Sequence, residues 1–239
     1  MNNKFKKMNQ NILLKYMEQR YKKKIQNEEQ HEPGPVVTIS RETGCPAKKI
    51  AALIIEKINA ELIPQNKKPW RAVSKEILYD SAKELNMNPD QIKYVFEYEE
   101  KSSWDDIFSS LSSKYYKSDK RIRKTIADVI HSIGEQGNVI IIGRGSVAIT
   151  KDIAKSLHIN LEAPLEWRAI MLSQKHGMTL EEAQKYAIET DKKRVKFRNS
   201  FYGRNTDYTR FDITFNCMTL SMDEISDTII ELLKRRNFI

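Results

Sequence analysis

The segment that most constrains the fold is residues 36–55, VVTISRETGCPAKKIAALII. It begins as a short β-branched run, passes through a turn of small residues and continues as an amphipathic helical pattern. This order is typical of a strand, a phosphate-binding loop and a helix, in which backbone N–H groups at the helix N-terminus face an anion. The loop is not a complete Walker A motif, G-x-x-x-x-G-K-[ST], because only Gly44 remains and Lys48 and Lys49 follow Pro46-Ala47.

The rest of the chain alternates between predicted strands and predicted helices. Residues 139–142 (VIII) form a continuous apolar run, which is typical of a strand buried on both faces of a parallel sheet. Residues 70–74, 156–161 and 211–216 are further strand candidates, and residues 165–176 and 179–199 are predicted helices. Two capping-box patterns open helices, Thr179 with Glu182 and Ser221 with Glu224. Strands separated by helices predict an α/β fold with a parallel sheet.

Ligands of parallel α/β sheets bind at the carboxyl ends of the strands, so the residues that follow each predicted strand are site candidates. The first strand is followed by the loop that ends at Lys49. The strand at 139–142 is followed by Gly143-Arg144-Gly145. Both segments suit a phosphate, since glycines allow a tight turn and an arginine fork binds two phosphate oxygens.

Composition agrees with an anionic ligand but does not identify it. The 239-residue chain carries a formal net charge of +9, which suits a nucleotide, a nucleic acid or a membrane surface, or is simply a solvated surface. Its two cysteines, Cys45 and Cys217, are far apart in sequence and make no disulfide framework, so we expect a reducing cytoplasm. No apolar run approaches the roughly 20 residues of a spanning helix. The four histidines lack metal-ligand spacing, and no metal site is predicted.

Residues 1–32 differ from the rest of the chain. Lysines outnumber acids there, and apolar residues recur near helical spacing, which predicts a basic helical extension before a domain at 33–239. This helix could dock on the domain, pair with another chain, contact an anionic surface or extend into solvent. Binding of nucleic acid by it is an interpretation that rests on charge alone.

Several segments, taken in order, resemble the cytidylate kinase-like family of P-loop nucleoside monophosphate kinases over roughly residues 36–235. They are residues 38–42 (TISRE), 139–145 (VIIIGRG), 161–168 (LEAPLEWR), 190–194 (TDKKR), 211–216 (FDITFN) and 220–224 (LSMDE). The resemblance implies a P-loop NTPase-type three-layer α/β/α fold. It also implies a helical acceptor-binding insertion at about 70–135 and a lid at about 190–210. The implied activity is phosphoryl transfer from ATP, with Mg²⁺, to CMP or dCMP.

The resemblance also implies roles for individual residues. The ATP phosphates would be held by the loop, with contacts from Thr43, Gly44, Cys45, Ala47, Lys48 and Lys49. The acceptor would be held by Lys75, Gly143, Arg144, Gly145, Asp191 and Arg194. Lys48, Arg194 and Arg198 are the predicted catalytic residues, the two arginines belonging to a basic run around a flexible segment at 199–203.

Other roles remain open for these residues. Lys48 and Lys49 could be solvated residues of a first helical turn, and Arg144 could make a structural ion pair. Arg41 and Glu42 could pair with each other or contact ligand. In family members this loop is usually glycine-rich, whereas Pro46 removes a backbone donor and Ala47 disfavours positive φ. The alternative prediction is therefore a catalytically impaired nucleotide-binding or regulatory module on the same fold.

Overall fold

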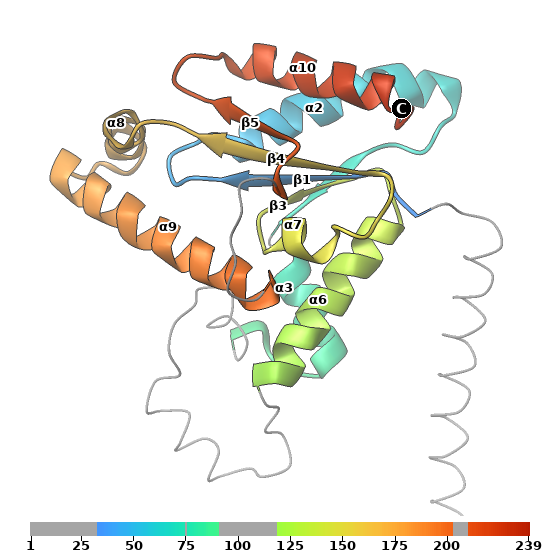
Figure 1. Cartoon of the computed structure of the whole chain (residues 1–239), viewed down its shortest axis with the longest axis horizontal. Coiled ribbons are helices and arrows are strands. Elements are labelled where there is room, and N and C mark those ends of the chain that lie inside the picture. Colours follow the sequence, from blue (N-terminus) through green and yellow to red (C-terminus); the bar gives the residue numbers. More distant parts are fainter. Residues whose placement is uncertain (1–32, 75, 91–118, 203–209) are drawn as a thin grey trace, which may run out of the picture. The chain divides into compact units, whose positions relative to one another are not determined.

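The computed structural model describes residues 33–74, 76–90, 119–202 and 210–239 (Figure 1). The chain divides into two compact units, residues 1–33 and 34–239, and the fold below is that of the second unit. The basic helix predicted at 1–32, Lys75, residues 91–118 of the predicted insertion and residues 203–209 of the predicted lid lie outside the described residues, so they stay predictions.

Five parallel strands form one sheet in the order β2-β3-β1-β4-β5. The central strand β1 pairs with β3 on one side, where Val36 lies opposite Val139. On its other side it pairs with β4, where Arg41 lies opposite Leu161. The strands are β1 (Val36–Arg41), β2 (Arg71–Val73), β3 (Val139–Ile142), β4 (Ser156–Glu162) and β5 (Ile213–Asn216). The predicted parallel α/β sheet is confirmed.

Helices cover both faces of this sheet, which gives the three-layer α/β/α arrangement (Figure 1). Helices α2 (Ala47–Leu62) and α10 (Met222–Arg235) pack together over one face. The other face is covered by α3 (Glu76–Leu85), α6 (Asp119–Glu135) and α7 (Ser146–Ile149). Each face has its own apolar cluster, because successive residues of β1 and β3 point to opposite sides. The described residues also form the 3₁₀ turn η1 (Ile63–Gln65) and the helices α8 (Leu165–His176) and α9 (Leu180–Tyr202).

Local capping signals fix two helix starts as predicted. Ser221 and Glu224 form a complete capping box at the start of α10. Thr179 and Glu182 exchange the corresponding hydrogen bonds before α9. Within the described ranges, no helix is long and apolar enough to cross a membrane.

Helix α9 extends further than the sequence predicted. Residues 199–202, which we expected to be flexible, form its last turn. Phe197 is buried, and its ring meets that of Phe201 edge to face at 5.2 Å between centroids. This aromatic pair favours continued helix because it packs the end of α9 against the molecule. The part of the predicted lid at 190–202 is therefore a packed helix.

Candidate functional site

The loop that joins β1 to α2 is held by a carboxylate from a distant helix. The backbone N–H and the hydroxyl of Thr43 both donate to Oδ1 of Asp191, at 2.7 and 2.6 Å. Asp191 lies on α9, 148 residues further along the chain. The predicted phosphate contact of Thr43 and the predicted acceptor contact of Asp191 are thus joined to each other in this structure.

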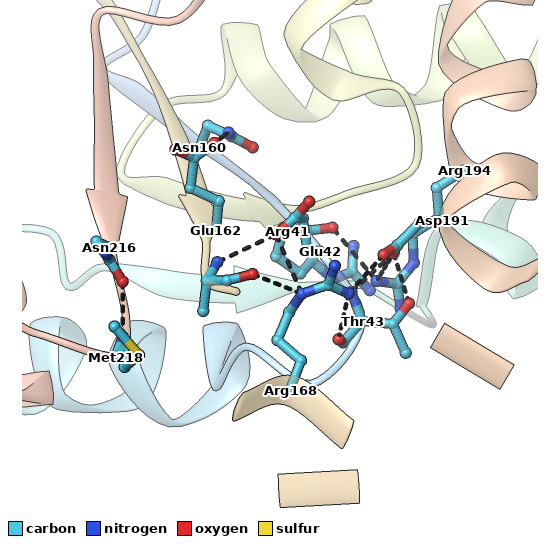
Figure 2. Close-up of polar contacts among 11 residues, drawn as sticks. Arg41, Glu42, Thr43, Asn160, Glu162, Arg168, Asp191, Arg194, Asn216 and Met218 are labelled. Atoms are coloured by element: carbon cyan, nitrogen blue, oxygen red, sulfur yellow. Dashed lines mark hydrogen bonds and ion pairs between the residues drawn. The ribbon is translucent and has the colours of Figure 1, made fainter. Parts of the chain in front are cut away.

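Arg168 ties this loop to α8 and α9 (Figure 2). Its side chain is only 8% exposed and forms ion pairs with Asp191 at 2.8 Å and with Glu42 at 3.2 Å. Its guanidinium also donates to the carbonyl oxygens of Ala163 at 2.8 Å and Thr43 at 3.1 Å. Glu42 accepts a second bond from the backbone N–H of Ala163. Of the roles left open for Glu42, the structure shows an ion pair, which is made with Arg168 and not with Arg41.

Gly44 is required where the loop crosses α8. Its φ is +105°, and a Cβ at this position would lie 2.8 Å from Cβ of Arg168. Any other residue would be strained in backbone and would collide with the helix. The role that this structure gives to Gly44 is close packing against α8.

The remaining loop residues present few free donors. The N–H of Cys45 donates to the carbonyl of Glu42, and that of Ala47 to the carbonyl of Cys45. Lys48 and Lys49 are exposed on the first turn of α2, and in the described part of the chain their backbone N–H groups have no hydrogen-bond acceptor. These two N–H groups, with the positive end of the helix dipole, are what the loop can offer a phosphate.

The two cysteines meet in space although 172 positions separate them. Cys45 packs against the apolar cluster that contains Cys217, and both thiols are free. The neighbouring Cys217 thiol and burial raise the pKa of the Cys45 thiol, whereas the Cys45 thiol lowers the pKa of Cys217. Cys45 is therefore a neutral thiol at neutral pH.

The segment after β3 makes an unusual turn. Gly143, Arg144 and Gly145 all have positive φ, at 69°, 62° and 68°. A Cβ at Gly143 would overlap the guanidinium of Arg41, and one at Gly145 would lie 2.9 Å from the ring of Phe201. Nε of Arg144 donates to the carbonyl of Ser74 at 3.2 Å. The predicted anion-binding turn thus lies against both β1 and the end of α9.

A cavity of about 220 Å³ opens at the carboxyl ends of β1 and β4 and is closed on one side by α9. It brings together the predicted Asp191, Arg194 and Arg198, but Lys48 and Arg144 do not line it. The guanidinium of Arg198 lies 5.6 Å from the ring centre of Phe211, a cation–π contact at the cavity wall. The complete lining is Arg41, Glu42, Val147, Asn160, Glu162, Asp191, Arg194, Val195, Arg198, Arg210 and Phe211.

Sequence reasoning gave no role to several residues of this site. Arg168 occurs in a segment that resembled the family, but nothing local indicates that it binds the loop. The sequence does not decide whether Arg41 forms an ion pair or contacts a ligand. Asn160 and Glu162 could have been found from the strand pattern, because they end β4 and point to the same face of the sheet.

A phosphate-loop-like turn after the central strand of a parallel sheet, with arginines at the carboxyl edge, defines a P-loop kinase-type α/β protein. More specifically, the chain belongs to the cytidylate kinase-like family, whose model matches residues 36–219. This membership supports phosphoryl transfer to a small substrate as the broad class of activity.

Comparisons with solved structures and curated proteins say less about function than the family model does. The crystal structure of an uncharacterized protein from Eubacterium ventriosum matches with 18% identity and a TM-score of 0.58, over 83% of this chain and 98% of that chain. This likeness shows the shared fold. Shikimate kinase from Bacteroides thetaiotaomicron matches with 13% identity and a TM-score of 0.45, over 83% and 98% of the two chains, which is too distant to carry an argument.

A curated uronate isomerase from Corynebacterium glutamicum is 22% identical over 138 residues. The match covers 56% of this chain and 26% of that protein, so the chain spans about a quarter of that relative.

Proposed function

We propose that this protein transfers the γ-phosphoryl group of ATP to a nucleoside monophosphate, CMP or dCMP. The observation that carries the proposal is the arginine-rich cavity at the carboxyl ends of β1 and β4, directly beside the phosphate-loop-like turn. Phosphoryl transfer requires positioning and the neutralisation of negative charge that spreads over the transferred group. Arginines from one strand and one helix, facing the same cavity, supply both.

The proposed contacts fall into three sets, for the ATP phosphates, the acceptor phosphate and the transferred group. The exposed Lys48 and the free N–H groups of the first turn of α2 would contact the ATP phosphates. Arg144, at the turn after β3, would hold the phosphate of the acceptor. Arg194 and Arg198 would face the transferred group from α9, since both line the cavity.

Mg²⁺ bound with ATP would supply neutralisation of the phosphate charge. Mg²⁺ usually takes one or two protein carboxylates plus substrate phosphates and water. Among the described residues, no group of three or more His, Cys, Asp or Glu side chains could hold a metal ion alone. Glu162 is the carboxylate that suits it, because Asp191 and Glu42 already pair with Arg168.

The second candidate function is a nucleotide-binding module without turnover. The hydrogen bonds of Thr43 to Asp191 favour it, since they take a loop N–H that a phosphate would otherwise receive. Pro46, directly before α2, removes a further donor.

One experiment separates the two functions. Nucleoside monophosphates are offered with ATP and Mg²⁺ in a coupled assay for ADP release, and nucleotide binding is measured in parallel by calorimetry. If the protein is the proposed kinase, it turns over with a cytidine acceptor. The turnover rate should fall roughly 100-fold or more in Arg144→Ala, because a charged phosphate contact is lost. Binding without turnover for any acceptor identifies the module.

Matched lysine variants test the loop. Lys48→Met should lower kcat/KM for ATP by roughly tenfold or more, whereas Lys49→Met should change it less than about threefold. Equal effects in the two variants would remove Lys48 from the site.

A further inference from the structure

Arg41, the last residue of β1, has no carboxylate partner among the residues that the structure describes. It lines the floor of the cavity, and in the part of the chain that the structure describes no acidic group lies within ion-pair distance of it. The nearby acids are committed elsewhere: Glu42 pairs with Arg168, and Asp191 accepts from Thr43 and Arg168. Figure 2 shows Arg41 between Glu162 and the Asp191–Arg194 pair.

Space for this guanidinium is left by Gly143. A Cβ at position 143 would overlap Nη1 of Arg41, so a side chain there would displace the guanidinium. The backbone carbonyl oxygen of Arg41 accepts a hydrogen bond from Nη1 of Arg194 at 3.3 Å. Arg41 therefore lies against the turn after β3 on one side and against α9 on the other.

The surroundings of Arg41 are electrostatically unfavourable in the absence of an anion. Burial, together with the positive charges of Arg194 and Arg144, lowers the pKa of Arg41 to about 9, and the carboxylate of Asp191 acts in the opposite direction. Burial also lowers the pKa of Arg194. A desolvated cation beside two other cations is stabilised by a ligand that brings negative charge.

We propose that Arg41 binds a phosphate group of a polyphosphate ligand, at a subsite formed with Arg194 and enclosed by the turn at Gly143. The guanidinium fork supplies phosphate contacts that a glycine-rich loop would make with backbone N–H groups. Phosphate recognition in this chain thus relies on a side chain at the end of β1. The inference deepens the proposed function and rests on it for the nucleotide, but the subsite itself requires no turnover.

Inorganic pyrophosphate tests the subsite without a nucleoside or a reaction. The full chain and three variants, Arg41→Gln, Arg41→Lys and Arg235→Gln, are titrated by calorimetry at low salt. Arg235 is a matched control because its side chain is 74% exposed and pairs with Glu231 of the same helix, α10. We expect Arg41→Gln to bind pyrophosphate roughly 10- to 100-fold more weakly and Arg235→Gln to bind as the native chain does. Arg41→Lys, which keeps the charge and loses the fork, should fall between them.

Thermal unfolding distinguishes a ligand contact from a structural role. Without pyrophosphate, Arg41→Gln should unfold at the same temperature as the native chain or higher, since it removes a desolvated charge. Pyrophosphate should raise the unfolding temperature of the native chain and leave that of Arg41→Gln unchanged. A lower unfolding temperature of Arg41→Gln in the absence of ligand would indicate a structural arginine and overturn the proposal.

The proposal is also overturned if the native chain binds no pyrophosphate, or if Arg41→Gln binds it equally well. Where Arg41→Gln does not fold, native-like affinity of Arg41→Lys has the same consequence. A chain that binds pyrophosphate through Arg41 but phosphorylates no acceptor would refute the kinase and keep the subsite.

Discussion

Replacing Arg168 by methionine should destabilise the protein more than any surface ion-pair change, because this one side chain joins the loop, α8 and α9. The variant leaves the carboxylates of Glu42 and Asp191 without their cation and the carbonyls of Thr43 and Ala163 without a donor. Methionine keeps the unbranched stem as far as the position of Nε and is flexible enough to fill space, so the effect reports mainly lost polar contacts.

The magnitude follows from the burial of the partners. Removing one partner of a buried pair costs roughly 3–5 kcal/mol. The Asp191 and Glu42 side chains are 21% and 38% exposed, so water can partly solvate them in the variant. We therefore expect a loss near the lower limit, about 3 kcal/mol, which corresponds to a fall in Tm of roughly 6–12 °C for a chain of this size.

Urea unfolding followed by circular dichroism measures this loss, with Arg235→Met as the control. The control breaks an exposed pair and should cost less than about 0.5 kcal/mol. A double-mutant cycle with Asp191→Asn should give a coupling energy of roughly 1–3 kcal/mol. A loss below about 1 kcal/mol in Arg168→Met, or no coupling, would refute the idea that this arginine holds the loop in place.

Three further predictions concern single side chains. Gly143→Ala and Gly177→Ala both place a Cβ at positive φ, costing roughly 1–2 kcal/mol. Only the Cβ at position 143 meets a neighbouring group, the movable guanidinium of Arg41, so the urea midpoint of Gly143→Ala should be slightly lower; a higher midpoint would contradict the contact. Iodoacetamide at neutral pH should alkylate Cys45 slowly in the native chain and rapidly in urea, because the neighbouring Cys217 thiol and burial raise the pKa of the Cys45 thiol; equal rates would contradict that shift. Burial lowers the pKa of His158 below its ordinary 6.5, so the unfolded chain binds a proton more readily and the free energy of unfolding falls as pH falls through this value. His158→Gln should lose less of this free energy between pH 7.5 and 5.5, and an unchanged pH dependence would contradict the shift.

The fold could be predicted because its signals are local. The apolar run of β3 marks a strand buried on both faces, and the Ser221–Glu224 box marks the start of α10 within a few residues. Each of these patterns is set by neighbours in the chain, and their alternation leaves few topologies other than a parallel sheet. The length of α9 was underestimated because the burial of Phe197, which packs its end, is a tertiary effect.

The site could be predicted only in part, since its decisive contacts join distant segments. The basic run in α9 indicated Arg194 and Arg198, and the structure places both at the cavity. No local pattern shows that Asp191 reaches Thr43 across 148 positions, or that Arg168 lies between them. Burial and pairing of charged groups depend on which strand ends become neighbours, and this is decided by the sheet order.

The contacts of the loop explain why the kinase and the binding module are hard to tell apart from structure. A phosphate bound at the backbone of Thr43 must displace the carboxylate of Asp191, which holds that N–H and the hydroxyl together. The displaced carboxylate would still face Arg168 and Arg194, so its charge would remain paired. A phosphate bound at Arg41 needs no such displacement and gains a cation that has no other partner among the described residues. Under the proposed function, a nucleotide would be bound mainly at the arginines, whereas turnover would depend on whether the ligand also brings Lys48 and α9 to the same phosphate.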